Sequence, residues 1–160
     1  MDQKTTTVLL RLSAGLWAVW GVFHLVLGIF LMAFTRNESP VGQLASLPMA
    51  VDISMMGQTS IYPVVPSLMQ HAFNLAWIGA VITGGCVFVW KQRTSAVFFC
   101  ALVGGLADVG YFLFVDLAGY AEPPGPQMTY ISGGAIILSS IAYFRGARPA
   151  RLGASQEGHD

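Results

Sequence analysis

The chain has 160 residues with equal numbers of basic and acidic side chains; 54% of its residues are hydrophobic and only 10% are charged. Soluble domains carry about 25% charged residues, so this composition excludes an ordinary soluble domain. The zero net charge provides no basic surface for nucleic acid, and two cysteines are too few for a disulfide scaffold.

Four apolar runs follow one another along the chain, and each has the length of a membrane span. A helix needs about 20 apolar residues to cross the hydrocarbon layer, with a range of about 17 to 25. Lipid offers backbone amides no hydrogen-bond partners, so helix is the expected state of these runs. We therefore expect an all-α, antiparallel four-transmembrane-helix bundle that forms a single membrane domain over 1–145. Its helices are expected at about 8–34, 67–90, 95–117 and 128–144, with an outer loop at 35–66 and a polar cytoplasmic tail at 146–160.

The basic residues indicate how this bundle is oriented. In a four-span arrangement, only Arg36 of the eight Lys and Arg residues falls on the second side. The positive-inside rule then places both termini and the 91–94 turn in the cytoplasm. The expected location is the inner (cytoplasmic) membrane, multi-pass, N-in and C-in. The seven basic residues on the cytoplasmic side are Lys4, Arg11, Lys91, Arg93, Arg145, Arg148 and Arg151.

Glycines are frequent in the second, third and fourth runs. Small residues let helices approach closely in lipid, where packing and not hydrophobicity drives association. We expect these glycines to serve helix packing, and the same holds for Cys86 and Cys100, which flank the 91–94 turn. The glycines concerned are Gly79, Gly84, Gly85, Gly104, Gly105, Gly110, Gly133 and Gly134.

Several polar side chains interrupt the apolar runs at a similar depth. With a rise of about 1.5 Å per residue, His24, His71, Asn74 and Asp108 lie about 20–28 Å from the cytoplasmic end of their helices. Polar groups avoid lipid, so they should face the inside of the bundle. Tyr111 lies on the same helical stripe as Asp108. The sequence thus predicts an outward-facing intramembrane pocket lined by these five residues.

Three interpretations of the polar residues stay open. In the first, Asp108 hydrogen-bonds a histidine or Tyr111 and fixes the packing of the bundle. In the second, the pocket binds a ligand or a proton, because intramembrane ionisable residues are often functional. In the third, His24 and His71 are the axial ligands of a b-type haem. A metal site is less favoured because the ligand set is sparse.

Two short motifs carry a resemblance. The pattern G-x-x-H-x-x-x-G over 21–28, around His24, and the pattern H-x-x-N-x-x-W over 71–77 resemble those of small uncharacterised bacterial four-helix integral membrane proteins. The resemblance covers the first two helices and implies an inner-membrane four-helix bundle. It implies no particular chemistry, since that family carries no assigned activity.

The expected function is non-enzymatic, because no nucleophile and base stand at a supporting spacing and no catalytic residue is assigned. We expect a small integral membrane protein whose polar pocket binds a small ligand, a lipid or a proton. One alternative is an accessory or assembly subunit of a larger membrane complex, and another is a b-type haem electron carrier. The expected partners are membrane lipid and, in the subunit alternative, other membrane subunits or a second copy, with no nucleic acid.

Overall fold

The computed structural model describes residues 2–35 and 64–146, and this part of the chain forms four α-helices and one short π-helix. The expected all-α class and the packing of four helices are confirmed. Most of the expected outer loop 35–66 and of the tail 146–160 lies outside the described residues. The helices are α1 (Gln3–Thr35), α4 (Val64–Trp90), α5 (Thr94–Tyr111), η2 (Phe112–Asp116) and α6 (Gly125–Gly146).

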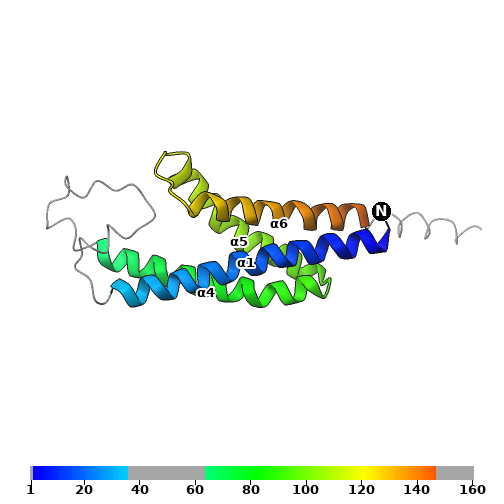
Figure 1. Ribbon diagram of the computed structural model, residues 1–160, viewed down its shortest axis with the longest axis horizontal. Coiled ribbons are helices and arrows are strands. Elements are labelled where there is room, and N and C mark those ends of the chain that lie inside the picture. Colours follow the sequence, from blue (N-terminus) through cyan, green and yellow to red (C-terminus); the bar gives the residue numbers. More distant parts are fainter. Residues whose placement is uncertain (1, 36–63, 147–160) are drawn as a thin grey trace, which may run out of the picture.

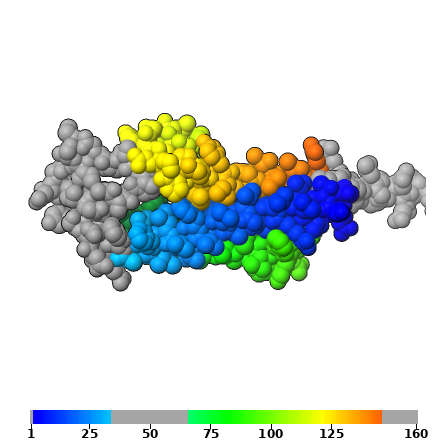
Figure 2. Space-filling model, viewed as in Figure 1, coloured from blue at the N-terminus to red at the C-terminus, as the bar shows by residue number. Residues whose placement is uncertain are grey.

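The helices are arranged as a closed ring. α1 packs against α4 and α6, and α5 packs against the same two helices from the opposite side. Consecutive helices run in opposite directions, so the ends of α1 and α5 lie together with the starts of α4 and α6 (Figure 1). In Figure 2, α1 lies across the visible face between α6 and the end of α4. The opposite end of the bundle holds the start of α1, the 91–94 turn and the end of α6 (Figure 1).

α1 begins with a capped first turn. The backbone N–H of Thr5 donates a hydrogen bond of 2.9 Å to the Asp2 carboxylate. This bond satisfies one of the donors that a helix start leaves free, and the negative charge suits the positive end of the helix dipole. The hydrogen bonds from Thr5 lower the pKa of Asp2, so the cap is present at neutral pH and is lost as the pH falls through that lowered value.

Three of the four long helices are long and apolar enough to cross a membrane: Gln3–Ala33, Pro66–Trp90 and Thr94–Asp116. Their outer surfaces are apolar as well; Leu106, for example, is 62% exposed and Leu102 is 61% exposed. A soluble protein would not expose such a continuous apolar surface to water. These features indicate a multi-pass membrane protein. α6 is not among the candidate spans, because glycine and hydroxyl residues dilute its apolar run.

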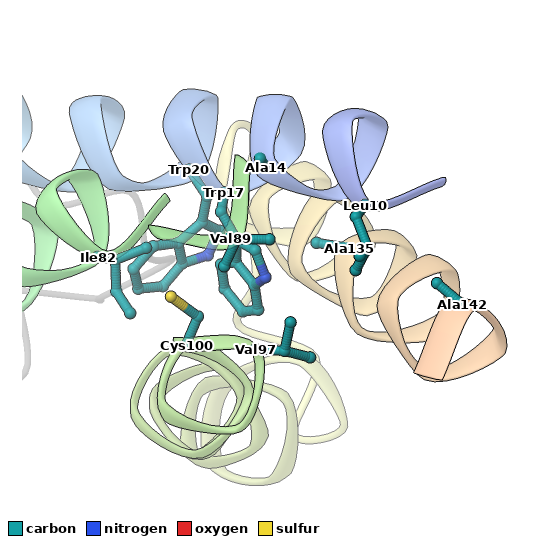
Figure 3. Packing of buried hydrophobic residues seen from close by; sticks show 10 residues of the cluster. All are labelled: Leu10, Ala14, Trp17, Trp20, Ile82, Val89, Val97, Cys100, Ala135 and Ala142. Atoms are coloured by element: carbon teal, nitrogen blue, oxygen red, sulfur yellow. The ribbon is translucent and has the colours of Figure 1, made fainter. Parts of the chain in front are cut away.

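A tryptophan pair fills the centre of the bundle. Trp17 and Trp20 of α1 are fully buried, and their rings meet edge to face with centroids 6.0 Å apart. Figure 3 shows both indoles directed between α4 and α5, next to Ile82 and Cys100. A β-carbon on Gly104 of α5 would overlap the Trp17 ring, so this position has room only for glycine.

α1 and α4 cross at a contact between their backbones. A β-carbon on Gly79 would overlap the backbone of Leu25 and stand 2.6 Å from the carbonyl oxygen of Gly21. One on Gly28 would overlap the backbone of Ala72 and Ala76 in the same way. Such close approach allows extensive van der Waals packing between helices in lipid. The crossing therefore depends on the absence of side chains at these glycines.

The expected role of the glycines is correct at some positions and wrong at others. Gly79, Gly85, Gly104 and Gly105 each face a neighbouring helix closely enough that a β-carbon would meet it at 3.0 Å or less. Gly134 is in ordinary contact range, with Leu16 at 3.4 Å. The remaining three, Gly84, Gly110 and Gly133, have nothing within 4 Å of an added β-carbon.

α5 does not end as a regular helix. Over η2 the backbone hydrogen bonds span five residues, as in the bond of 2.9 Å from the N–H of Leu117 to the carbonyl of Phe112. The wider turn changes the direction of the side chains that follow Tyr111. Short π-helical segments of this kind are often found at functional sites.

Candidate functional site

A cavity of about 510 Å³ lies inside the ring, near the end where α1 and η2 finish and α4 and α6 begin. All four long helices contribute to its wall, and most of the wall is apolar. The five polar residues that the sequence predicts for a pocket all line this cavity: His24, His71, Asn74, Asp108 and Tyr111. The structure thus brings them together, and their binding role stays a prediction.

Asp108 of α5 is held by a residue of α1. The Trp20 indole N–H donates a hydrogen bond of 2.8 Å to the Asp108 carboxyl group, and both side chains are buried. The Ser132 hydroxyl of α6 lies beside the same carboxyl group. The prediction that a histidine or Tyr111 is the hydrogen-bond partner of Asp108 is wrong. The partner is the Trp20 indole, which lies one helical turn before His24 and reaches from α1 to α5.

His24 is fixed against the same tryptophan. Its ring stacks on the Trp20 indole with centroids 3.8 Å apart, and its Nδ1 lies 2.8 Å from the Trp20 carbonyl oxygen. A carbonyl only accepts hydrogen bonds, so Nδ1 carries the proton. In the neutral ring Nε2 is then an acceptor, and within the described part of the chain no hydrogen bond occupies it.

His71 and Asn74 line the cavity from α4, nearer the start of that helix. The Trp77 indole N–H donates a hydrogen bond of 3.0 Å to the Asn74 side-chain oxygen, which leaves the Asn74 amide nitrogen as a donor toward the cavity. His71 differs from the expectation of an inward-facing group, because its side chain is exposed as well as lining the cavity. It therefore stands at the open side of the site.

Tyr111 reaches the first turn of α6. A β-carbon at Gly125 would overlap the Tyr111 hydroxyl, so the tyrosine fits there only against glycine. The hydroxyl is buried, and within residues 2–35 and 64–146 it has no hydrogen-bond partner. Buried polar groups are rarely left unpaired, so this hydroxyl is available to a molecule in the cavity.

Metal and haem ligation depend on few residues. Among the described residues, no group of three or more His, Cys, Asp or Glu side chains could hold a metal ion. His24 and His71 line the same cavity, and the free Nε2 of His24 has the tautomer that a haem iron requires. The haem alternative stays a prediction. An absorbance spectrum of the purified protein checks it: a Soret band lost in both His24→Ala and His71→Ala supports haem, and a colourless preparation excludes it.

The cysteines lie away from this cavity. Cys100 is fully buried in the tryptophan-centred core, as expected for a packing residue. Cys86 is partly buried, and its thiol donates a hydrogen bond of 2.9 Å to the carbonyl of Thr83. Neither forms a disulfide in the structure.

Comparison with known proteins adds no further identification. The chain matches no protein-family model, no curated protein and no solved structure. The resemblance through the motifs at 21–28 and 71–77 accordingly stays a prediction, and the function has to be argued from the cavity itself.

Proposed function

We propose that this multi-pass membrane protein binds a small amphipathic ligand in the cavity between its four helices. The observation that carries the proposal is the cavity itself: about 510 Å³, mostly apolar, with His24, Asn74, Asp108 and Tyr111 contributed by three helices. Binding sites for small molecules are typically apolar chambers of about 300–1,000 Å³ with a few polar groups that orient the ligand.

The arrangement of the polar groups favours a ligand with both an apolar body and a polar head. The hydrogen-bonding groups include the acceptor Nε2 of His24, the donor amide of Asn74 and the unpaired hydroxyl of Tyr111. Most of the other residues of the wall are apolar, with aliphatic, methionine, proline and aromatic side chains. A purely apolar lipid tail would bury those polar groups without a hydrogen-bond partner, which costs free energy.

As part of the same proposal, α6 is the fourth membrane span and both termini lie in the cytoplasm. The 22 residues of α6 rise about 33 Å, enough for a hydrocarbon core of about 30 Å. Lys4 near the start of α1, Lys91 directly after α4 and Arg145 in the last turn of α6 share one end of the bundle, because consecutive helices run in opposite directions. Arg11 lies 5.2 Å from the ring of Trp90 at the same end, as in an interfacial belt. The cavity then opens toward the outer side.

Filling the cavity should abolish ligand binding without unfolding the protein. Ala107 of α5 lines the cavity and is partly buried, so Ala107→Leu extends a side chain from the wall into space that the ligand would occupy. We expect native mass spectrometry of the wild-type protein, purified from its own membrane, to show a bound small molecule that Ala107→Leu lacks.

Ala80→Leu is the matched control for this experiment. Ala80 of α4 is exposed and does not line the cavity. The control should keep the bound molecule and the wild-type melting temperature. A bound molecule retained by Ala107→Leu, or no bound molecule in the wild-type protein, would contradict the proposal.

A further inference from the structure

Building on the proposed function, we infer that the cavity binds an organic monocation, such as a quaternary ammonium group, that pairs with the Asp108 carboxylate. The cation would supply the positive partner that this carboxyl group lacks among residues 2–35 and 64–146. A positive charge on the ligand is what this inference adds; the proposed function requires only that a ligand binds.

The charge balance around the cavity favours a positively charged ligand. Among the described residues, no lysine or arginine lines the cavity, and the hydrogen-bond donors beside the Asp108 carboxyl group are neutral: the indole of Trp20 and the hydroxyl of Ser132. Asp108 is 6% exposed. A carboxylate at this depth needs either a proton or a positive charge beside it. An uncharged or anionic ligand would supply no positive charge.

The aromatic side chains that line the cavity also favour a cation. The rings of Phe23 and Tyr111 line the cavity together with Asp108. The face of an aromatic ring carries negative partial charge and attracts cations, most strongly where water is excluded. Aromatic rings around one carboxylate are a chemistry that favours quaternary ammonium groups over neutral isosteres.

The other titratable groups set the expected pH dependence. His24 faces the cavity from α1, His71 from α4, and Asp108 and Tyr111 from α5; the lining residues of α6 are not titratable. Protonation of Asp108 removes the charge that attracts the cation, and protonation of either histidine adds a charge that repels it. All three effects act in the same direction, so affinity for a cation should rise as the pH rises.

The test uses two probes of the same shape. Benzyltrimethylammonium is a cation, and neopentylbenzene is its neutral carbon isostere. Binding is measured by equilibrium dialysis of the labelled cation against the full chain in detergent, with protein-free micelles as the blank and the isostere as competitor. We expect the cation to bind and an equal concentration of the isostere to compete at least about tenfold less well, a difference in charge interaction alone.

The matched variants are Asp108→Asn and Asp116→Asn. Asparagine retains an oxygen that accepts the Trp20 N–H, so Asp108→Asn should fold normally and bind the cation at least about tenfold more weakly. Asp116 ends η2 and does not line the cavity, so Asp116→Asn should bind like the wild type. Equal binding by both Asn variants would overturn the inference, as would no cation binding by the wild type.

Two further comparisons are made: one distinguishes a lipid headgroup from a free cation, and the other distinguishes failure of the cation inference from failure of the proposed binding function. If the natural ligand is a choline lipid headgroup, bilayers of phosphatidylcholine will compete with the probe and bilayers of phosphatidylglycerol will not; a free cation predicts equal probe binding in both. If the isostere competes as well as the cation and Ala107→Leu blocks both, the cation inference fails while the proposed binding function stands.

Discussion

Gly79→Leu is expected to destabilise the bundle by about 3 kcal/mol or more, the largest effect of any single substitution considered. Any side chain at Gly79 would overlap the α1 backbone at Leu25 and Gly21. Backbone atoms cannot change rotamer, so α1 and α4 would have to separate. Their crossing is the most extensive helix contact in the structure, and its separation would also open the neighbouring core.

Gly84→Leu is the control for this prediction. Gly84 lies on the same helix but has nothing within 4 Å of an added β-carbon, so its replacement should change stability by less than about 0.5 kcal/mol. The measurement is unfolding of both variants in mixed micelles of a mild detergent and sodium dodecyl sulfate, followed by circular dichroism. Similar midpoints for the two variants would show that the helix crossing does not depend on Gly79.

Gly79 and Gly84 also show which features of the fold can be predicted from the sequence and which cannot. Four helices and their order follow from apolar runs of the right length, because lipid leaves the backbone no other structure. The rotation of each helix about its axis does not follow so readily. Gly79 and Gly84 occur in the same apolar run, yet one touches a neighbouring backbone and the other faces open space. That difference is decided by packing partners far away in the sequence.

The candidate site, too, is predictable from the sequence only in part. Depth alone brought His24, His71, Asn74 and Asp108 to one level, and the structure places them around one cavity. Depth could not identify hydrogen-bond partners, which depend on angles around the helix. Trp20 was missed although a signal existed: a buried indole N–H needs an acceptor, and Trp20 lies one turn from His24 on the polar side of the helix. The short π-helix gives no comparable sequence signal.

Trp20→Phe is expected to destabilise the protein by about 2–3 kcal/mol. Trp20 is fully buried, and phenylalanine leaves a cavity where the larger indole ring stood. It also removes the donor to the Asp108 carboxyl group, an interaction of 2.8 Å between α1 and α5. Trp77→Phe is the control: it too removes an indole hydrogen bond, but Trp77 is 43% exposed, so less than about 1 kcal/mol should be lost.

The two contributions to the Trp20 effect can be separated with a second substitution. Interhelical hydrogen bonds in membrane proteins contribute on average about 0.6 kcal/mol and at most about 1.7 kcal/mol, so lost packing should account for most of the change. In an Asp108→Leu background there is no carboxyl group left to satisfy, and only the packing loss should remain. The effect of Trp20→Phe should therefore be smaller there by about 1 kcal/mol, measured by the same micellar unfolding.

The size of this coupling bears on how the site works. A coupling near zero would mean that the Trp20 N–H contributes nothing to holding Asp108, and that the carboxyl group is free to change its orientation within the cavity. The expected coupling of about 1 kcal/mol instead means that α1 fixes the carboxyl group of α5 before any ligand enters. His24 stacks on the same indole at 3.8 Å, so Trp20→Phe should also disorder the imidazole ring. Trp20→Phe should therefore weaken ligand binding in addition to destabilising the ligand-free protein, because it disturbs both the carboxyl group and the imidazole ring that line the cavity.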